Sequence, residues 1–510
     1  MNLFGAIIEK AFKLVKKINS RRYSPFQHQR RTLKRLIKKS STTAFGEYYH
    51  FSDLYSEKEI MKKFSEQVPL HDYNSMFEQW WHRTIKNESD VTWKGKIKYF
   101  ALSSGTTGSP SKYIPVSKEM IRSIQHAGIK CFVSLTNYHV DPDLYTKQML
   151  MLSGTTTLKK VDGAYAGDLS GINVANTPFW IRKTSKPGKD IASMTNWNDR
   201  IEEIARKASE WNIGYLMGIP SWNKLMIDRV VEYNKVENIQ DIWPNLRVFV
   251  HGGVAFEPYR KIFDSLVKKP LIYIDTYLAS EGFIAYQSHP NATGMELLLN
   301  NGIFYEFLEF NDKNFDNSGN VKGNPSTYFI HQVKEGIDYA LVISTCAGAW
   351  RYIIGDTIRF TDVNRNEIII TGRTKHFLSI CGEHLSVDNM NQALKLTAQK
   401  WDLQIPEFTV AAFHDNKKFV HKWYIGCNKS VDKEVITKEL DENLQKLNDD
   451  YKTERSAVLN MPMVHVIDSQ IFYLWMQHQG KMGGQYKFPR VMTQDQFIEW
   501  EEFVKKAIAK

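Results

Sequence analysis

The sequence has few cysteines and no long apolar segment. Its four cysteines are far apart and form no Cys-x-x-Cys pair, so neither a zinc ribbon nor a disulfide framework is expected. No apolar run approaches the length needed to cross a bilayer. A Gly-x-Ser-x-Gly elbow and a His-Glu-x-x-His motif are also absent, which argues against a serine hydrolase and a zinc protease. These absences lead us to expect a globular protein of the reducing cytoplasm.

Length and composition favour an ordered chain with more than one core. The 510 residues exceed what a single simple core holds, and the 42% of hydrophobic residues exclude a disordered chain. The net charge of +11 is compatible with nucleic acid, a membrane surface or anionic substrates as partners. Much of this charge lies near the amino terminus, so it says little about the rest of the chain.

The amino terminus has an amphipathic helical pattern with a basic face. Apolar residues between Leu3 and Ile18 recur at helical spacing among lysines. Such a helix either packs on its own domain or lies on an anionic membrane. Because the apolar pattern continues through Leu33 and Ile37, packing is the favoured interpretation and membrane contact stays the alternative. No aromatic ladder accompanies the basic clusters, so no nucleic-acid partner is expected.

The rest of the chain alternates helical and strand patterns, which predicts an α/β protein. The expected helices are at residues 117–137, 198–211, 258–268, 388–401 and 433–448, with a further one from Pro220, and the expected strands are at 246–250, 271–274, 303–310, 339–344 and 367–371. The pattern becomes mainly helical near residues 374–380. We therefore expect a large N-terminal mixed α/β domain with a β-rich subdomain at residues 1–376 and a small mobile α+β domain at 377–510.

A loop of glycines and small hydroxyl residues follows a strand-like run at residues 99–102. Glycines let backbone N–H groups approach an anion, hydroxyls add donors and a lysine adds positive charge, so the loop is suited to phosphates. It is not a Walker A loop, because its lysine is not preceded by glycine and followed by Ser or Thr. An ordinary surface turn is the alternative. The loop residues are Ser103, Ser104, Gly105, Thr106, Thr107, Gly108 and Lys112.

Two glycines follow the strand expected at 246–250. Gly252 and Gly253, with Ala255, stand where a ligand can lie flat against the backbone at the carboxyl edge of a sheet. An ordinary turn between a strand and a helix explains the same residues, so this segment indicates a ligand site only together with the other segments.

An acidic segment follows the strand expected at 271–274. A carboxylate such as Glu281 is suited to holding Mg²⁺ beside phosphate oxygens. Tyr277, in the same segment, is suited to stacking on a purine, and Ser280 lies between them. A surface glutamate is the alternative.

Two later residues complete the pattern. Asp356 follows a glycine at an expected turn, and such an aspartate can accept both hydroxyls of a ribose. Arg373 lies where the β-rich region gives way to the helical one, so a ligand between two domains would meet it. Gly-Asp is also a common turn dipeptide.

In this order, the segments resemble the adenylate-forming superfamily of acyl-CoA synthetases, peptide-synthetase adenylation domains and luciferases. Within it, the chain is similar to the GH3 family of acyl acid amido synthetases, first known as auxin-responsive proteins of plants. The details favouring GH3 are Tyr-Leu-Ala-Ser-Glu at 277–281, Arg-Tyr-Ile-Ile-Gly-Asp at 351–356 and Gln-Tyr-Lys-Phe-Pro-Arg at 485–490. The resemblance spans nearly the whole chain, from about residue 30 to about residue 500.

The resemblance implies ATP and Mg²⁺ as cofactors. Glu281 matches the family's magnesium-linked glutamate, and Lys487 is the candidate for the lysine of the mobile domain that approaches the acyl phosphate. The residues implied to bind ATP are Ser103 to Gly108 with Lys112 at the phosphates, Gly252, Gly253, Ala255 and Tyr277 at the adenine, Asp356 with Arg373 at the ribose, and Ser280.

The implied activity is the adenylation of a carboxylic acid and transfer of its acyl group to an amine or amino acid. A thioester-forming acyl-CoA ligase is the alternative within the class, and a nucleotide-binding protein without catalysis is the alternative outside it. Ser111, His376 and Ser379 depart from the wider superfamily pattern, which puts CoA binding in doubt. Acyl-adenylates hydrolyse, so we expect residues beyond about 377 to form a lid that moves between the two half-reactions. We expect the acid to be bound by the 117–137 helix and by segments near 165–180 and Trp222.

Overall fold

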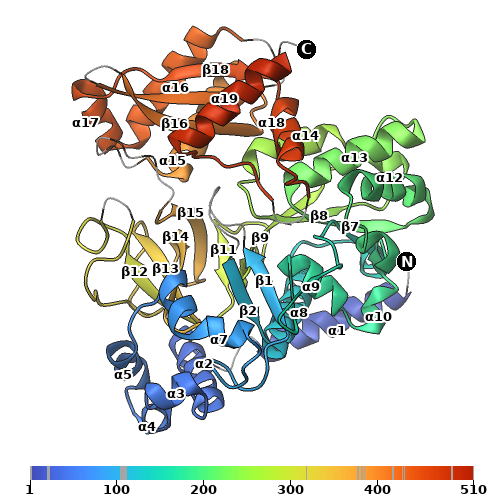
Figure 1. Ribbon diagram of the computed structural model, residues 1–510. Coiled ribbons are helices and arrows are strands. Elements are labelled where there is room, and N and C mark those ends of the chain that lie inside the picture. The colour runs from blue at the N-terminus through green and yellow to red at the C-terminus, as the bar shows by residue number, and fades with distance from the viewer. Residues whose placement is uncertain are drawn as a thin grey trace.

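Among the described residues, eleven strands form one sheet through the large N-terminal domain (Figure 1). The computed structural model describes residues 3–19, 23–103, 112–316, 319–375, 378, 380, 383, 385–415, 418–427, 429, 431–483 and 486–508. The strands follow the order β12-β13-β14-β15-β11-β10-β9-β8-β7-β3-β6. Their bounds are β3 Gln148–Met151, β6 Ser185–Lys186, β7 Ile213–Gly218, β8 Val248–Gly252, β9 Ile272–Ala279, β10 Gly282–Tyr286, β11 Met295–Leu297, β12 Ile303–Glu309, β13 Asp338–Thr345, β14 Tyr352–Asp362 and β15 Glu367–Arg373.

The sheet is parallel on one side of β9 and antiparallel on the other. The pairs β9–β8, β8–β7, β7–β3 and β3–β6 are parallel. The pairs from β9 through β10, β11, β15, β14 and β13 to β12 are antiparallel. Ligands bind beyond the carboxyl ends of parallel strands, and Gly252 at the end of β8 pairs with Thr276 of β9. The change in strand direction therefore occurs at the strand that carries Tyr277.

A second, four-stranded sheet carries the phosphate-loop candidate. Its order is β2-β1-β5-β4, with β1 Tyr99–Ser103, β2 Lys112–Val116, β4 Lys159–Val161 and β5 Ala164–Gly167. Strands β1 and β2 form a hairpin in which Ser103 pairs with Lys112. The loop thus leads into a strand, and the expected helix begins only after it. Residues 104–111, which include Ser104, Gly105, Thr106, Thr107, Gly108 and Ser111, lie outside the described residues.

Helices cover these sheets (Figure 1). In the large domain they are α1 Leu3–Asn19, α2 Pro25–Ser40, α3 Ala44–Tyr48, α4 Phe51–Ser56, α5 Ile60–Gln67, α6 Tyr73–Met76, η1 Phe77–Trp81, α7 His82–Ile85, α8 Lys118–Ser134, η2 Leu135–Asn137, η3 Pro142–Thr146, α9 Leu169–Ala175, α10 Phe179–Arg182, α11 Lys189–Ala192, α12 Trp197–Lys207, η4 Ala208–Glu210, α13 Pro220–Asn234, η5 Ile239–Asp241 and α14 Glu257–Ser265. The predicted cap of α8 is confirmed, because the Ser117 side chain accepts a hydrogen bond from the backbone N–H of Met120.

Two of the predicted local structures were wrong. Tyr277 lies within β9 rather than after it, because the strand continues past Ile274 to Ala279. Asp356 lies within the long strand β14 rather than at a turn. Gly355 has a φ of +92°, a left-handed backbone value that glycine tolerates, so the Gly-Asp pair bends a strand without ending it.

The helix α1 packs on the large domain, as favoured from its sequence. Ile8 and Phe12 contact the main apolar core, and the ring of Phe12 lies 5.8 Å from that of Phe132 and 5.6 Å from that of Tyr145. Ile7 remains 56% exposed, so the helix buries one face only. Within the described residues, no helix combines the length and the apolar character needed to cross a membrane.

The small C-terminal domain is a three-stranded sheet with helices, which confirms the predicted α+β class. Its strands are β16 Glu407–Asp415, β17 Lys418–Gly426 and β18 Met463–Ile467, in the order β16-β17-β18. Its helices are α15 Val387–Trp401, α16 Lys433–Leu447, α17 Asp449–Ala457, α18 Gln470–His478 and α19 Gln494–Ile508. Phe408, Trp423 and Leu440 belong to its own core. The boundary expected at residues 376 and 377 falls outside the described residues, as do His376 and Ser379, and it stays a prediction.

A shared apolar core joins the two domains, and we call it the docking seam. Trp222, Phe263 and other side chains of α12, α13 and α14 contribute from the large domain. Phe472, Phe488 and Trp500 contribute from the small domain. Ring centroids of Phe488 lie 4.7 Å from Phe472 and 5.0 Å from Trp500. The small domain is therefore seated on the large one by hydrophobic burial.

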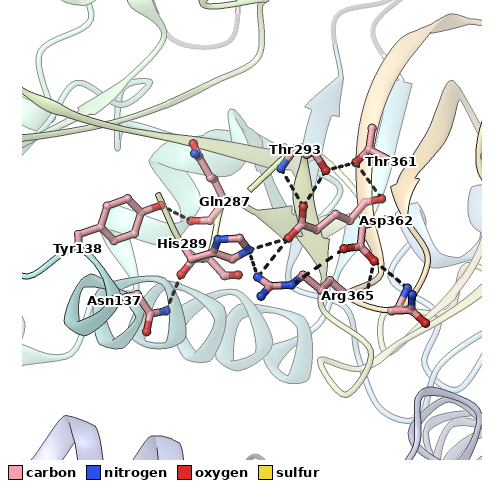
Figure 2. A network of polar contacts seen from close by, with 11 residues as sticks. Asn137, Tyr138, Gln287, His289, Thr293, Thr361, Asp362 and Arg365 are labelled. Carbon is pink, nitrogen blue, oxygen red and sulfur yellow. Dashed lines mark hydrogen bonds and ion pairs between the residues drawn. The ribbon is translucent and has the colours of Figure 1, made fainter. Parts of the chain in front are cut away.

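A polar network fixes the connection between β10 and β11 (Figure 2). The Glu367 carboxylate, 2% exposed, lies 2.7 Å from His289 Nε2 and accepts a hydrogen bond of 2.9 Å from the backbone N–H of Thr293. Arg365 also contacts the His289 ring. Tyr138 donates to the Gln287 carbonyl oxygen at 3.1 Å. These contacts anchor the first residue of β15, the strand whose last residue is Arg373.

Candidate active site

A single cavity of about 2230 Å³ lies where the large and small domains meet. Apart from Ser103 and the residues of the β1–β2 loop, all the candidate residues line it. They are Lys112, Gly252, Gly253, Ala255, Tyr277, Ser280, Glu281, Asp356, Arg373 and Lys487. Ser103 ends β1 opposite Lys112, at the edge of the same region. Residues separated by several hundred positions in the sequence thus share one site.

The backbone at the end of β8 leaves no room for larger side chains. A Cβ on Gly252 would collide with the carbonyl oxygen of Thr276 on the neighbouring strand. Gly253 has a φ of +85°, and a Cβ there would lie 3.1 Å from Lys487 Cε. Glycine therefore allows both the close strand pairing and the close approach of a lysine from the other domain.

Tyr277, Asp356 and Arg373 form a hydrogen-bonded group. The Tyr277 hydroxyl donates to Asp356 Oδ2 at 2.6 Å, and Arg373 Nε lies 2.9 Å from Asp356 Oδ1. The pairing of β14 with β15 sets Asp356 opposite Arg373. Burial and the Asp356 charge hold the pKa of the Tyr277 hydroxyl well above its usual value, so it stays a donor. A carboxylate offers about four acceptor positions, so Asp356 retains capacity for a ligand.

Glu281 lies in the turn between β9 and β10 and is 8% exposed. Burial and the nearby Asp356 charge raise the pKa of its carboxyl to about 7, although Lys112 and Arg373 act in the opposite direction. Burial is the larger of these causes, so a cation beside Glu281 would stabilise its ionised form. A hard carboxylate oxygen in such surroundings fits Mg²⁺, which proteins often hold through one or two carboxylates plus substrate phosphates. No cluster of three or more metal-ligating side chains occurs among the residues described, so substrate oxygens would complete the coordination.

Lys112, at the start of β2, faces the same carboxylate. Burial lowers the pKa of its ammonium, whereas the Glu281 charge raises it. Its Nζ lies 5.4 Å from the centre of the Tyr73 ring, a contact that sequence reasoning missed because Tyr73 belongs to a distant helix. A lysine with little compensating charge is suited to an anionic ligand.

Lys487 reaches the cavity from the small domain. Its side chain is exposed toward the cleft, and a Cβ on Gly253 would lie 3.4 Å from its Nζ. The surrounding protein lowers the pKa of its ammonium by desolvation, and the Asp356 charge raises it. Of the segment expected around Trp222, Gly218 and Ile219 line the cavity and Trp222 itself does not. Its indole Nε1 donates to the carbonyl oxygen of Tyr486 at 2.8 Å instead.

Part of the cavity lining is apolar, and we call this part the apolar arm. Side chains of α8, including Ile124 and Phe132, line it together with Ile8 and Phe12 of α1. Residues 168–170, 173–175 and 177–178 line the cavity as well, so the expected contributions from the 117–137 helix and the 165–180 segment are both present. The part played by α1 has no local motif and was missed.

Comparisons with known proteins agree on one family. The GH3 family N-terminal domain matches residues 14–163 and 159–272, the central domain matches 296–371 and the C-terminal domain matches 388–496. An indole-3-acetic acid-amido synthetase GH3.4 of Arabidopsis thaliana is 26% identical over 282 residues, which cover 50% of this chain and 45% of that protein. A jasmonoyl-L-amino acid synthetase JAR4 of Nicotiana attenuata is 21% identical over 398 residues, covering 65% of this chain and 66% of that protein.

The matches to these relatives leave much of their length uncovered. An indole-3-acetic acid-amido synthetase GH3.15 of Arabidopsis thaliana is 26% identical over 218 residues, and the chain spans only 36% of its length.

Solved structures extend the likeness to the whole fold. The GH3.15 acyl acid amido synthetase has a TM-score of 0.76 at 17% identity, covering 97% of this chain and 96% of that one. A 2-hydroxyisobutyryl-CoA ligase bound to an acyl-AMP has a TM-score of 0.59 at 11% identity, covering 94% and 91%. At this identity, the second likeness concerns the fold alone. With three domain models matched in order along its length, the chain belongs to the GH3 family.

Proposed function

We propose that this protein is an ATP-dependent acyl acid amido synthetase, which joins a carboxylic acid to the amino group of an amino acid. Enzymes of the GH3 family use ATP. The observation that carries the proposal is the single cavity lined by Tyr277, Glu281 and Asp356 of the large domain and Lys487 of the small domain.

The first half-reaction activates the acid. A carboxylate oxygen attacks the α-phosphorus of ATP, a new P–O bond forms, and the bond to the bridging oxygen breaks so that pyrophosphate leaves with its electron pair. The product is an acyl-adenylate, whose leaving group is AMP. A free carboxylate lacks such a leaving group, which is why activation is needed.

The attack brings a carboxylate close to phosphate oxygens, so cations must offset the growing negative charge. Lys112, Arg373 and Lys487 line the cavity and supply positive charge. The loop from Ser103 to Gly108 would add backbone and hydroxyl donors to the phosphates. Asp356 would accept the ribose hydroxyls, with Tyr277, Gly252, Gly253 and Ala255 beside the adenine.

Glu281 would hold Mg²⁺ through a carboxylate oxygen. Its raised pKa supports this role, because a bound cation would relieve the cost of ionising a buried carboxyl. When bound, the ion neutralises phosphate charge. The residues of this chain then orient the acid against the nucleotide.

The second half-reaction makes the amide. The amine nitrogen attacks the acyl carbonyl carbon, a C–N bond forms, and the C–O bond to AMP breaks as AMP leaves with the electron pair. The nitrogen releases a proton. We further propose that the domain beyond residue 376 is a lid that moves between the two half-reactions.

The apolar arm supports an acid with a bulky apolar body. Its walls include Ile124, Phe132 and Phe12. The named relatives act on indole-3-acetic acid and form jasmonoyl conjugates, and one related structure holds 2,4-DB. Auxin-like and jasmonate-like acids are therefore the first to test.

An ATP–pyrophosphate exchange screen over such acids tests adenylation. Exchange with at least one acid, followed by amide formation with an amino acid, is the expected result. Thioester formation with CoA in place of an amide would identify the ligase alternative. Absence of exchange with every acid, under conditions where ATP binds, would overturn the proposal.

A further inference from the structure

Helix α14 of the large domain reaches the small domain through a buried tyrosine. The Tyr259 hydroxyl, in a side chain 1% exposed, donates a short hydrogen bond to Glu407 Oε1 of β16. Arg490 Nη1 lies 2.7 Å from Glu407 Oε2. Tyr473 also contacts Glu407 Oε1, at 3.4 Å. One carboxylate thus receives donors from both domains.

Arg490, one member of this cluster, follows Lys487 by three residues in the sequence. On the other side of the lysine, the Tyr486 carbonyl oxygen accepts the hydrogen bond from Trp222 Nε1, at 2.8 Å. We call the hydrogen bonds Trp222–Tyr486 and Tyr259–Glu407 the two tethers. Between Tyr486 and Arg490, Phe488 is buried in the docking seam. The segment 486–490 is therefore held to the large domain on both sides of the lysine that extends over Gly253.

The two tethers differ from the other contacts of the cluster because they cross between domains. Arg490 also donates to the carbonyl oxygens of Pro406 at 3.1 Å and Phe408 at 3.3 Å, all within the small domain. If the small domain turned away, Glu407 would keep Arg490 as its partner and lose only Tyr259. Burial and the Glu407 charge hold the pKa of the Tyr259 hydroxyl well above its usual value, so it remains a donor.

Resting on the proposed function, we propose that Tyr259 and Trp222 are positioning residues that hold Lys487 in the arrangement for acid activation. Neither residue lines the cavity, and both would act through the segment 486–490. The Tyr259 hydroxyl stabilises the contact between the two domains. Because Glu407 is also paired with Arg490, moving the domains apart would not leave its carboxylate without a partner.

The small domain contains a matched control. The Tyr451 hydroxyl donates to Asp441 Oδ1 at 2.7 Å, and Arg455 Nε contacts the same oxygen at 2.7 Å. This is the same tyrosine–carboxylate–arginine chemistry, equally buried, but it lies entirely within one domain. Tyr451→Phe therefore removes a comparable hydrogen bond and leaves the tethers intact.

The test compares Tyr259→Phe with Tyr451→Phe in the full chain. We expect Tyr259→Phe to lower the rate of ATP–pyrophosphate exchange about tenfold or more, as expected from loss of a hydrogen bond to a charged group. Transfer from preformed acyl-adenylate should stay within about twofold. Tyr451→Phe should leave both rates within about twofold. Trp222→Phe should resemble Tyr259→Phe.

Two further measurements separate positioning from general structure. In a Lys487→Ala background, Tyr259→Phe should cause no additional loss of exchange, because its effect passes through Lys487. Amide hydrogen exchange of residues 486–491 should be faster in Tyr259→Phe and unchanged in Tyr451→Phe.

Several outcomes would overturn the proposal. Unchanged pyrophosphate exchange in Tyr259→Phe would do so, as would equal losses in both half-reactions or losses that add to those of Lys487→Ala. A wild-type protein without exchange would instead overturn the proposed function, and hydrogen exchange of residues 486–491 would still decide whether Tyr259 holds the segment.

Discussion

The cleft and the docking seam both bring the two domains together, but they treat charge in opposite ways. In the cleft, burial raises the pKa of Glu281 to about 7 and lowers the pKa of Lys112. In the seam, Glu407 and Arg490 satisfy each other at 2.7 Å and receive Tyr259 as a further donor. Burial disfavours the charged forms of Glu281 and Lys112 in the cleft, whereas Glu407 and Arg490 at the seam stabilise each other's charge.

The difference separates binding from closure. Groups whose charged forms are disfavoured by burial gain when an oppositely charged ligand arrives. Glu407, which is already paired with Arg490 and Tyr259, instead helps to define how the two domains fit together. On the proposed function, the cleft would hold magnesium and nucleotide, and the seam would bring Lys487 to them.

The largest effect should come from removing the charge of Glu281. Glu281→Gln keeps the shape of the side chain and removes the proposed magnesium ligand, so pyrophosphate exchange should fall about 10³-fold. Glu296→Gln, at an exposed position of β11, is the matched control and should be nearly neutral. Near-normal exchange in Glu281→Gln would contradict the proposed need for a charged carboxylate in the cleft.

The same carboxyl should make stability depend on pH in the absence of metal and nucleotide. Because its pKa is about 7 when folded and about 4.5 when unfolded, the folded chain binds more protons between these values. Stability should therefore fall as pH rises from about 4.5 to about 7, by at most about 3 kcal/mol. Urea unfolding of wild type and Glu281→Gln should show a steeper fall in the wild type. Parallel pH profiles would contradict the prediction.

Lys487 should matter somewhat less and only in one half-reaction. Lys487→Ala removes one of several cations around the reacting phosphate, so exchange should fall about 10²-fold while transfer from preformed acyl-adenylate is retained. Lys505→Ala on α19 is the control for loss of a small-domain lysine. A loss of transfer equal to the loss of exchange would show that Lys487 serves the fold of the segment and not adenylation.

The smallest effect concerns stability within the small domain. Tyr451→Phe removes a hydrogen bond to Asp441 that Arg455 also contacts, so unfolding free energy should fall by about 1–2 kcal/mol. Denaturant unfolding measures this change. A large loss of adenylation with this variant would show that the Tyr451 cluster affects adenylation as the Tyr259 cluster is proposed to do.

Local patterns predicted the elements of the fold better than the contacts between them. The helix from Pro220, the cap at Ser117 and the strands β12, β13 and β15 follow from apolar periodicity and end residues. The GH3 membership and the α/β class are confirmed. Helix α12 ends earlier than expected, because residues 208–210 form a separate 3-10 turn.

The site was predictable where short motifs follow strands and unpredictable where partners are distant. Glu281 and Asp356 stand in recognisable motifs, and both line the cavity. Tyr259 meets a carboxylate 148 positions away, and no local pattern marks it. Trp222 was expected near the acid, but its N–H binds the Tyr486 carbonyl oxygen. The sequence does not reveal whether the ring or the N–H of a tryptophan makes the important contact. The roles of the ATP-binding residues stay predictions.

The helix α1 has a consequence for any shortened form of this chain. Phe12 and Ile8 belong to the apolar part of the cavity lining. Without them, the cavity would lose part of its apolar lining and would be wider on the side of α1. On the proposed function, an amino-terminal truncation would then relax the selection among acids, while leaving the residues around Glu281 and Asp356 in place.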